Sequence, residues 1–277
     1  MKPPFKSMLF CNEEWEWSDV MLPAMVQPKL DGVAAYKAGG EIWTKRGKLF
    51  PNNRIRTYLR EVLEEGMDCE IWHPHMTFHQ ISGFCRRIKD TPPIGWLAMV
   101  YDRSRPYMSE AYVIRYRKLL EWYDDSPHVN EQQTVRIMDS VLCHTQEDIE
   151  ATHFENTLQG QEGSMIRALH APYYHGRTGI KDGFGFKFVG LEYDTAMFTG
   201  TTANSNSVKA ATMIGAIVCE HKKWGRLHIG SGFDHTLSKD MYDNPARYTG
   251  QVVRFKYKKH GTEEKPRQPI FVSFEGK

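Results

Sequence analysis

The chain has 277 residues, of which 40% are hydrophobic, so it can bury a sizeable core and is long enough for two domains. Its 36 basic and 34 acidic residues leave a net charge of +2, which excludes a globally basic nucleic-acid coat and a highly charged disordered chain. No apolar run approaches the roughly 18 residues of a transmembrane helix, and Met1–Phe5 lacks the apolar stretch of a signal peptide. We therefore expect a cytoplasmic protein that is neither secreted nor bound to a membrane.

The stretch Val26–Gly32 combines a lysine with a tight turn. Lys29 stands two residues before Asp31-Gly32, and a turn of this kind can hold the amine towards a binding site. Pro28 biases Gln27 towards an extended conformation, which suits a strand that ends in a tight loop. Lysine becomes a nucleophile when desolvation or a nearby positive charge lowers its pKa. Because a solvated surface turn has the same short pattern, the catalytic interpretation depends on partner motifs elsewhere in the chain.

The chain from residue 33 to residue 189 alternates between strand-like and helix-like patterns. Two apolar-rich runs around Gly39-Gly40 predict a β-hairpin. Apolar residues at helical spacing predict a helix that begins at Asn53 and stops at Gly66. The predicted strands are 33–37, 41–47, 68–72, 96–102, 163–166 and 183–189, and the predicted helices are 53–65, 110–123 and 130–141.

Charged residues stand within or beside several of these predicted strands. Asp68 and Glu70 share one strand face, where two carboxylates are costly to bury unless they meet a cation or a ribose hydroxyl. Glu162 and Arg167 bracket a short apolar strand, and Lys187 lies at the centre of another. These positions are candidates for a site that binds phosphate or a cation.

Histidines and cysteines do not indicate a metal centre. His73 and His75 would point the same way on a strand, with His79 nearby, but no fourth ligand follows at a suitable spacing, which favours a solvated hairpin. The five cysteines are scattered and none forms a Cys-x-x-Cys pair. This pattern indicates reduced thiols rather than a disulfide framework or a zinc site.

The sequence pattern changes near Gly190, and short predicted β-strands follow from Asp194. They are 214–219, 226–229, 252–257 and 270–274, with a helix near 238–242. About five short strands with an inserted helix are typical of an OB-type barrel. We therefore expect a first domain over 1–192 and a second over 193–277.

The end of the chain is rich in basic residues interleaved with aromatic ones. This combination predicts a surface that follows a phosphate backbone. The candidate contacts of this surface are Arg247, Arg254, Lys256, Lys258 and Lys259.

Four segments in this order, Lys29–Gly32, Asp68–Ile71, Glu162–Arg167 and Ile214–Phe274, resemble the covalent nucleotidyltransferase superfamily. More narrowly, the chain is similar to the minimal ATP-dependent DNA ligases of viruses and phages, from about Val26 onwards. The resemblance implies an α+β fold, with an adenylation (nucleotidyltransferase) domain of antiparallel sheets and flanking helices followed by a C-terminal OB-fold β-barrel. It also implies a monomeric enzyme that uses ATP and Mg²⁺ to seal nicked duplex DNA.

The resemblance further implies a chemical role for three residues. Lys29 would attack the α-phosphate of ATP to form a lysyl-AMP, and AMP would then pass to the 5′-phosphate of a nick, where the 3′-hydroxyl displaces it. Lys187 would neutralise phosphate charge, and Asp31 would assist the sealing step. Both roles suit a reaction that is catalysed by positioning and by cations around charged phosphates.

Six residues take binding roles by the same resemblance. Gln27 would read the adenine edge, while Tyr101 and Met165 would lie against the two faces of the purine; on pattern alone, Tyr101 reads as ordinary core. Glu70 would contact the ribose or a metal ion, and Glu162 would hold Mg²⁺. Lys45 would contact the nucleotide and the nick phosphates.

The sequence departs from the family pattern at several positions and leaves alternatives open. Ala34 stands where a ligase usually has arginine, Lys45 replaces another arginine, and Val189 replaces a second lysine. The alternatives are an RNA ligase, a GTP-using RNA capping enzyme, or a nucleic-acid-binding relative with impaired catalysis. Val33 and the segment Glu162–Arg167 favour a DNA ligase over an RNA ligase.

Overall fold

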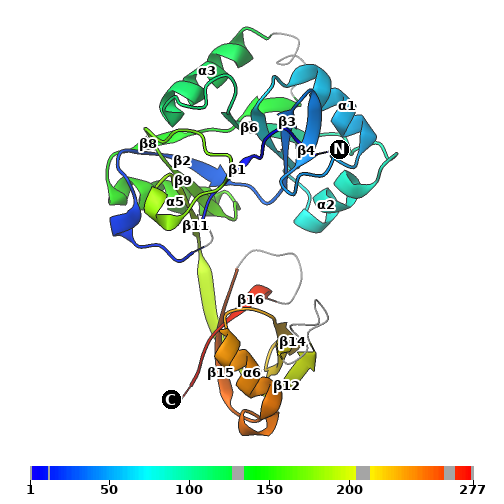
Figure 1. The fold of residues 1–277 in the computed structure, drawn as a ribbon, viewed down its shortest axis with the longest axis vertical. Helices are drawn as coiled ribbons and strands as arrows, with labels where there is room; N and C mark the ends of the chain where they lie inside the picture. The colour runs from blue at the N-terminus through cyan, green and yellow to red at the C-terminus, as the bar shows by residue number, and fades with distance from the viewer. Residues whose placement is uncertain (1, 12, 127–133, 204–212, 259–265, 276–277) are drawn as a thin grey trace. The chain divides into compact units, whose positions relative to one another are not determined.

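The computed structural model describes residues 2–11, 13–126, 134–203, 213–258 and 266–275. The chain divides into two compact units, Met1–Val189 and Gly190–Lys277 (Figure 1). None of the helices within the described residues has the length and apolar character needed to cross a membrane.

The first unit contains two larger sheets and a two-stranded parallel pair, β1-β10. One sheet has the strand order β4-β3-β5-β6-β7 and the other the order β11-β9-β2-β8. Both are antiparallel except where β6 pairs with β7 in parallel. The strands are β1 (Met8–Leu9), β2 (Ala24–Lys29), β3 (Val33–Ala38), β4 (Glu41–Thr44), β5 (Met67–Trp72), β6 (Leu97–Arg103), β7 (Val135–Ile137), β8 (Val141–Cys143), β9 (Gly163–Ala168), β10 (Gly176–Arg177) and β11 (Gly185–Val189).

Helices flank these sheets, as the resemblance implies (Figure 1). The helices of this unit are α1 (Asn53–Val62), α2 (Phe78–Arg86), α3 (Tyr112–Asp124), α5 (Gln146–Leu158) and the short 3₁₀ turns η1 (Trp17–Asp19) and η2 (Ile180–Asp182). Helix α1 begins at Asn52, whose side-chain oxygen accepts hydrogen bonds from the amides of Arg54 and Ile55 at 3.0 and 3.1 Å. Helix α5, which the sequence patterns did not indicate, begins with a capping box between Thr145 and Asp148.

The predicted hairpin and several predicted strands are confirmed. Gly39 and Gly40 have φ values of 60° and 74° and connect β3 to β4 in a conformation that favours glycine. The predicted helix over 130–141 is wrong in the part that the structure describes: Val135–Ile137 and Val141–Cys143 are strands. Each of them adds to the edge of a sheet, β7 beside β6 and β8 beside β2, and these tertiary pairings outweigh a weak local helical pattern.

Each larger sheet has one core face and one face with polar residues. In the five-stranded sheet, Cys69, Ile71 and Val100 are fully buried among side chains of α1, α2 and α3. The acids Asp68 and Glu70 alternate with them and therefore occupy the other face. In the four-stranded sheet, the cross-strand partners Val26, Ile166 and Phe186 belong to a core with α5 and the N-terminal tryptophans.

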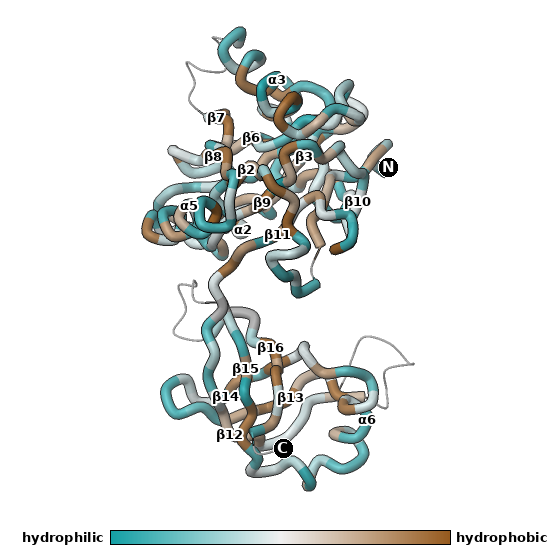
Figure 2. The backbone as a smooth tube through the Cα atoms, turned by 90° about the vertical axis from the view of Figure 1, so that its left-hand side faces the viewer, coloured by the Kyte–Doolittle hydropathy of each residue, from teal (hydrophilic) through white to brown (hydrophobic). Residues whose placement is uncertain are grey.

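The second unit is an OB-like barrel with an inserted helix. Its strands are β12 (Leu191–Ala203), β13 (Ile214–His221), β14 (Gly225–Ile229), β15 (Val252–Lys258) and β16 (Arg267–Phe274), and its helices are α6 (His235–Asp243) and the 3₁₀ turn η4 (Pro245–Arg247). The strand order is β14-β13-β12-β15-β16. The Phe271 amide donates to the Ser231 carbonyl at 2.9 Å, which links the end of β14 to β16 across the barrel. Hydrophobic and hydrophilic stretches are interspersed along these strands (Figure 2), as expected for a barrel with a packed interior.

Candidate functional site

Three of the predicted nucleotide-binding residues form one row across the four-stranded sheet. Gln27 on β2 pairs with Met165 on β9, and Met165 pairs with Lys187 on β11. Directly paired residues place their side chains on the same sheet face, and this row alternates with the core residues of the opposite face. The register therefore brings together residues that are far apart in the sequence.

The next row on the same face contains Lys29, Gly163 and Val189. Gly163 has a φ of 154°, and a Cβ built there would lie 2.3 Å from the Phe188 carbonyl oxygen. Only glycine fits this close approach of β9 to β11. Val189, which replaces a family lysine, thus lies in the same row as the predicted nucleophile.

Lys29 lies at the end of β2 and is held by Glu162. The Lys29 ammonium group donates to Glu162 Oε2, and the Glu162 amide donates to the Lys29 carbonyl at 3.1 Å. The Glu162 side chain is only 3% exposed, whereas that of Lys29 is 18% exposed. The amine therefore remains accessible to a ligand, while its partner carboxylate is shielded from water. Ionic interactions are stronger in such a shielded environment than in water.

The loop after Lys29 contacts the five-stranded sheet at Glu70. A Cβ at Gly32 would lie 2.4 Å from the Ile71 carbonyl oxygen and 2.8 Å from Glu70 Cγ, so glycine allows this contact. Burial raises the pKa of the Glu70 carboxyl to about 7, although the ammonium groups of Lys29 and Lys45 act in the opposite direction.

Two further predicted residues belong to the surroundings of Glu70. Asp31, which is partly buried, raises the pKa of Glu70 further by its own negative charge. Lys45 is exposed just after β4. Both residues therefore lie within the electrostatic influence of the site rather than at a distance from it.

A β-bulge on β6 places Tyr101. Asp68 pairs with Asp102 and Cys69 with Val100, so Tyr101 is the extra residue between two cross-strand pairs. The Arg167 guanidinium carbon lies 5.2 Å from the Tyr101 ring centroid. Desolvation and the negative charges of nearby acids raise the pKa of Tyr101 well above its usual value, so its hydroxyl stays neutral. The ring is partly buried beside Arg167, and its stacking on a purine stays a prediction.

A buried network of ion pairs contacts Gln27, the first residue of the row formed with Met165 and Lys187. The sequence only partly indicated this network. Arg167 donates from Nε to Gln27 Oε1 at 2.9 Å and from a terminal nitrogen to Asp102 at 3.0 Å. The Arg115 guanidinium donates two hydrogen bonds to the Asp102 carboxylate, at 2.9 and 3.1 Å. Burial alone would raise the pKa of Asp102, but the charges of both arginines outweigh it and lower that pKa. An acid at the end of an otherwise apolar strand pattern was the available signal for Asp102.

The predicted DNA contacts of the second unit fall into two groups. Arg254 and Lys256 occupy alternate positions of β15, and the Arg254 guanidinium carbon lies 5.1 Å from the Tyr193 ring centroid. Lys258 ends this strand. Arg247 lies apart in η4 and donates to Asp240 of α6 at 3.2 Å. Lys259 lies outside the described residues.

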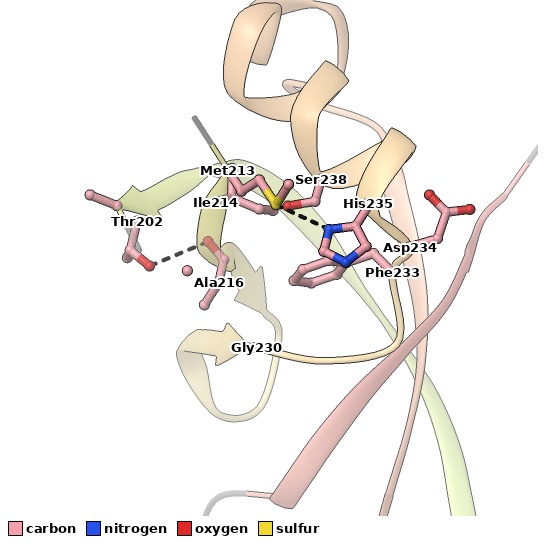
Figure 3. A pocket seen from close by; sticks show the side chains of 11 residues that line it. Thr202, Met213, Ile214, Ala216, Gly230, Phe233, Asp234, His235 and Ser238 are labelled. Atoms are coloured by element: carbon pink, nitrogen blue, oxygen red, sulfur yellow. Dashed lines mark hydrogen bonds between the residues drawn. The ribbon is translucent and has the colours of Figure 1, made fainter. Parts of the chain in front are cut away.

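A cavity of about 580 Å³ lies in the second unit beside the start of α6 (Figure 3). Its described lining includes no lysine or arginine. The His235 Nδ1 atom lies 3.2 Å from the Met213 sulfur, and the Asp234 carboxylate accepts a hydrogen bond from the Leu237 amide. The Asp234 carboxylate at the start of α6 repels an anion, and His235 is already in contact with Met213. The cavity is therefore less suited to binding phosphate than the predicted nucleic-acid surface.

Comparisons with known proteins agree with this architecture. Residues 207–274 match the family model of the DNA ligase OB-like domain. The Chlorella virus DNA ligase–adenylate structure is 25% identical, with a TM-score of 0.63 and 99% of each chain covered. A Lig E DNA ligase is 20% identical with a TM-score of 0.76, and covers 98% of this chain and 99% of its own. The ATP complex of the bacteriophage T7 ligase is 11% identical with a TM-score of 0.54, and 98% of each chain is covered.

No curated protein sequence matches the chain. The Lig E and T7 similarities concern the fold, whereas the Chlorella virus similarity also includes a quarter of the residues. Together with the OB-like match and the two-unit architecture, they show that the chain has the fold of the minimal ATP-dependent DNA ligases, with a second unit similar to the DNA ligase OB-like domain.

Proposed function

We propose that the chain seals nicks in duplex DNA through a lysyl-AMP intermediate formed on Lys29. The observation that carries this proposal is the ion pair of Lys29 with Glu162, next to the row of Gln27, Met165 and Lys187. In this proposal the nucleophile, the phosphate-neutralising lysine and the base-facing amide share one sheet face, and the shielded carboxylate lies beside the nucleophile. Nucleotidyl transfer needs these elements because it depends on positioning and charge stabilisation.

In the first step the Lys29 amine attacks the α-phosphorus of ATP. A P–N bond forms, the bond from the α-phosphorus to the bridging oxygen breaks, and pyrophosphate leaves with the bonding electrons. The ammonium group must first lose a proton, and the Glu162 carboxylate with which it is paired can accept one. Lys187, two residues along β11 from Val189, would neutralise charge on the α-phosphate.

Glu70 and Glu162 suit Mg²⁺ as oxygen ligands. Within the described residues, no cluster of three or more His, Cys, Asp or Glu side chains could hold a metal ion without help. Mg²⁺ is commonly held by one or two carboxylates together with substrate phosphates, so these two residues fit that ion. When bound, it would supply positive charge against the triphosphate.

In the later steps AMP passes from Lys29 to the 5′-phosphate of a nick, and the 3′-hydroxyl then displaces AMP to form the phosphodiester. Lys45 would contact the nick phosphates, and Asp31 would assist the displacement. Arg254, Lys256 and Lys258 on β15, with Arg247 and Lys259, would follow the duplex backbone rather than read bases. We propose that Met1–Val189 acts as the adenylation domain and that the protein works as a monomer in the cytoplasm, in replication or repair.

The proposal predicts that Lys29→Ala abolishes the covalent adduct. Wild-type protein incubated with ATP and Mg²⁺ should gain the mass of AMP, and Lys29→Ala and Lys29→Arg should not, because arginine stays protonated. Intact-mass spectrometry and peptide mapping measure this. The exposed Lys89→Ala is the matched control and should form the adduct normally.

Two results would contradict the assignment. AMP on Lys45 or Lys187 would place the nucleophile elsewhere. A protein that forms no adduct with ATP, but does so with GTP, or that seals only RNA nicks, would belong to one of the alternative nucleotidyltransferase classes. Offering nicked DNA and nicked RNA to the adenylated protein separates these cases.

A further inference from the structure

The Trp15 indole lies against the strand that carries Lys187. Its Nε1 atom donates a hydrogen bond to the Lys187 carbonyl at 3.1 Å, across 172 positions of the chain. Its ring centroid lies 5.4 Å from that of Phe186 and 5.7 Å from that of Phe188, the two neighbours of Lys187. One side chain of the N-terminal segment therefore contacts three consecutive residues of β11.

The Lys187 carbonyl lies on an open edge of the sheet. In the described part of the chain, β11 is an edge strand with β9 as its one neighbour. The Phe184 carbonyl accepts from the Ala168 amide at 3.1 Å, on the side of β9. Carbonyls of successive residues in a strand alternate in direction, so the Lys187 carbonyl, three positions further on, faces away from β9. The Trp15 indole thus provides at this edge a donor that a further strand would otherwise supply.

The same contacts determine the face from which the Lys187 side chain projects. Phe186 is 1% exposed, and the Phe188 ring is stacked on that of His153 with 3.9 Å between centroids. Side chains alternate between the two faces of a sheet, so Lys187 projects from the opposite face, next to Met165. A strand that is anchored at this carbonyl and at both flanking rings holds the Lys187 backbone at one place relative to the site.

We propose that Trp15 is a positioning residue for adenylation. It holds the β11 backbone so that the Lys187 ammonium group meets the α-phosphate of ATP, and it does not touch the nucleotide itself. A displacement of about 1 Å in a group that stabilises the transition state can reduce a rate by about 100-fold. The inference rests on the proposed function, because it takes Lys187 as the residue that neutralises phosphate charge.

A double-mutant cycle tests whether Trp15 acts through Lys187. Trp15→Phe keeps an aromatic ring beside Phe186 and Phe188 and removes the N–H donor. It should slow single-turnover lysyl-AMP formation at saturating ATP by about tenfold, with the half-saturating ATP concentration within about threefold of wild type. In a Lys187→Ala background the same substitution should slow the reaction by less than about twofold, because the group that Trp15 positions is absent. The same cost in both backgrounds would overturn the proposal.

Trp17→Phe is the matched control. The Trp17 ring contacts those of Trp15 and Phe188, with 5.3 and 5.5 Å between centroids, but within the described residues it donates no hydrogen bond to β11. This variant should lose a similar part of the unfolding free energy and keep its adenylation rate within about twofold of wild type. A rate as low as that of Trp15→Phe would overturn the proposal, because packing alone would then explain the effect.

Hydrogen–deuterium exchange separates this inference from the proposed function. Without nucleotide, the amides of the peptide that contains Gly185–Val189 should exchange at least about fivefold faster in Trp15→Phe than in Trp17→Phe. Equal exchange would overturn the anchoring by Trp15. A wild-type protein that forms no adduct with ATP would overturn the proposed function, and the exchange rates would still decide the anchoring.

A measurement on the wild-type protein decides the case if Trp15→Phe does not fold. The Trp15 indole N–H signal, assigned by triple-resonance NMR, should shift when α,β-methylene-ATP binds, because phosphates at Lys187 alter the strand whose carbonyl accepts from this N–H. The Trp17 indole signal should shift less. An equal or smaller shift for Trp15 would overturn the proposal.

Discussion

At the scale of single residues, the site depends on charges whose partners are distant in the sequence. Lys29 and Glu162 are 133 positions apart, and Arg167 and Asp102 are 65 apart. Both pairs are largely shielded from water. In such an environment, removing one partner leaves an uncompensated charge and destabilises the fold more than it would at the surface. Substitutions at these residues therefore test chemistry and folding together, and each needs a readout for both.

Replacing Glu162 by glutamine separates its charge from its hydrogen bond. In Glu162→Gln the amide oxygen can still accept from Lys29, but it cannot take a proton, so lysyl-AMP formation should slow by about 100-fold. The loss should shrink as pH rises, because hydroxide in solution increasingly replaces the carboxylate as the proton acceptor. Single-turnover adduct formation across a pH series measures this. An unchanged rate at every pH would remove Glu162 from proton transfer, and urea unfolding checks that the variant is folded.

Glu70 predicts a pH dependence of stability. Its pKa in the folded protein is about 7, raised from 4.5 by burial, so the folded state holds the proton more tightly than the unfolded state. The resulting stabilisation is complete below the unfolded value and is lost as pH rises through the folded value. Between about pH 5 and pH 8, wild type should therefore lose about 1–3 kcal/mol more of its unfolding free energy than Glu70→Gln. Urea unfolding of both proteins measures it, and parallel curves would contradict the assignment.

At the scale of elements, strand register determines which residues share the site. The close approach of β9 to β11 at Gly163 places Lys187 opposite Met165 and Val189 opposite Gly163. On the other sheet, the bulge before Asp102 re-aims Tyr101. A one-residue shift in either sheet would turn the site residues to the core face.

A methyl group at Gly163 should disturb this register. Gly163→Ala meets the Phe188 carbonyl and a φ that disfavours alanine, so it should destabilise the protein by more than about 1 kcal/mol and also slow adenylation. Gly83→Ala is the matched control, because a Cβ there has no atom within 4 Å and lies inside α2. That variant should be stabilised by about 0.5–1 kcal/mol. Thermal or urea unfolding compares them, and equal effects would show that the strand contact is unimportant.

At the scale of the whole molecule, the first unit carries the proposed nucleotide site and the second carries the basic strand β15. The net charge of +2 provides no general attraction for DNA, so we expect the affinity to come from local clusters such as Arg254 and Lys256. Binding through backbone phosphates should be strongly dependent on salt.

Arg254→Ala should weaken binding to nicked duplex DNA and reduce the slope of log affinity against log salt by about 1, because one phosphate contact is lost. Arg117→Ala, an exposed arginine of α3 that pairs with Glu121, is the control and should leave the slope unchanged. Fluorescence anisotropy over a salt series with the full chain measures both. The same slope for Arg254→Ala and wild type would exclude Arg254 from the interface.

The local parts of the fold could be predicted from the amino-acid sequence. The Lys-x-Asp-Gly turn, the Gly-Gly hairpin and the alternating strands follow from φ preferences and from the period of apolar residues, which act over a few positions. The order of motifs was enough to indicate the family and the OB-like second unit.

The way in which these parts combine depends on contacts between distant segments and could not be predicted from local patterns. A helix was expected over 130–141, but the described residues of this segment form edge strands, because sheet pairing outweighs local helix propensity. The partner of Lys29, the bulge at Tyr101 and the Arg115–Asp102–Arg167 network join distant segments, and no local pattern encodes such contacts. The orientation of the Gln27 amide is one such case. The sequence gives the residue, but the direction of its side-chain NH₂ group is set by Arg167, 140 positions away.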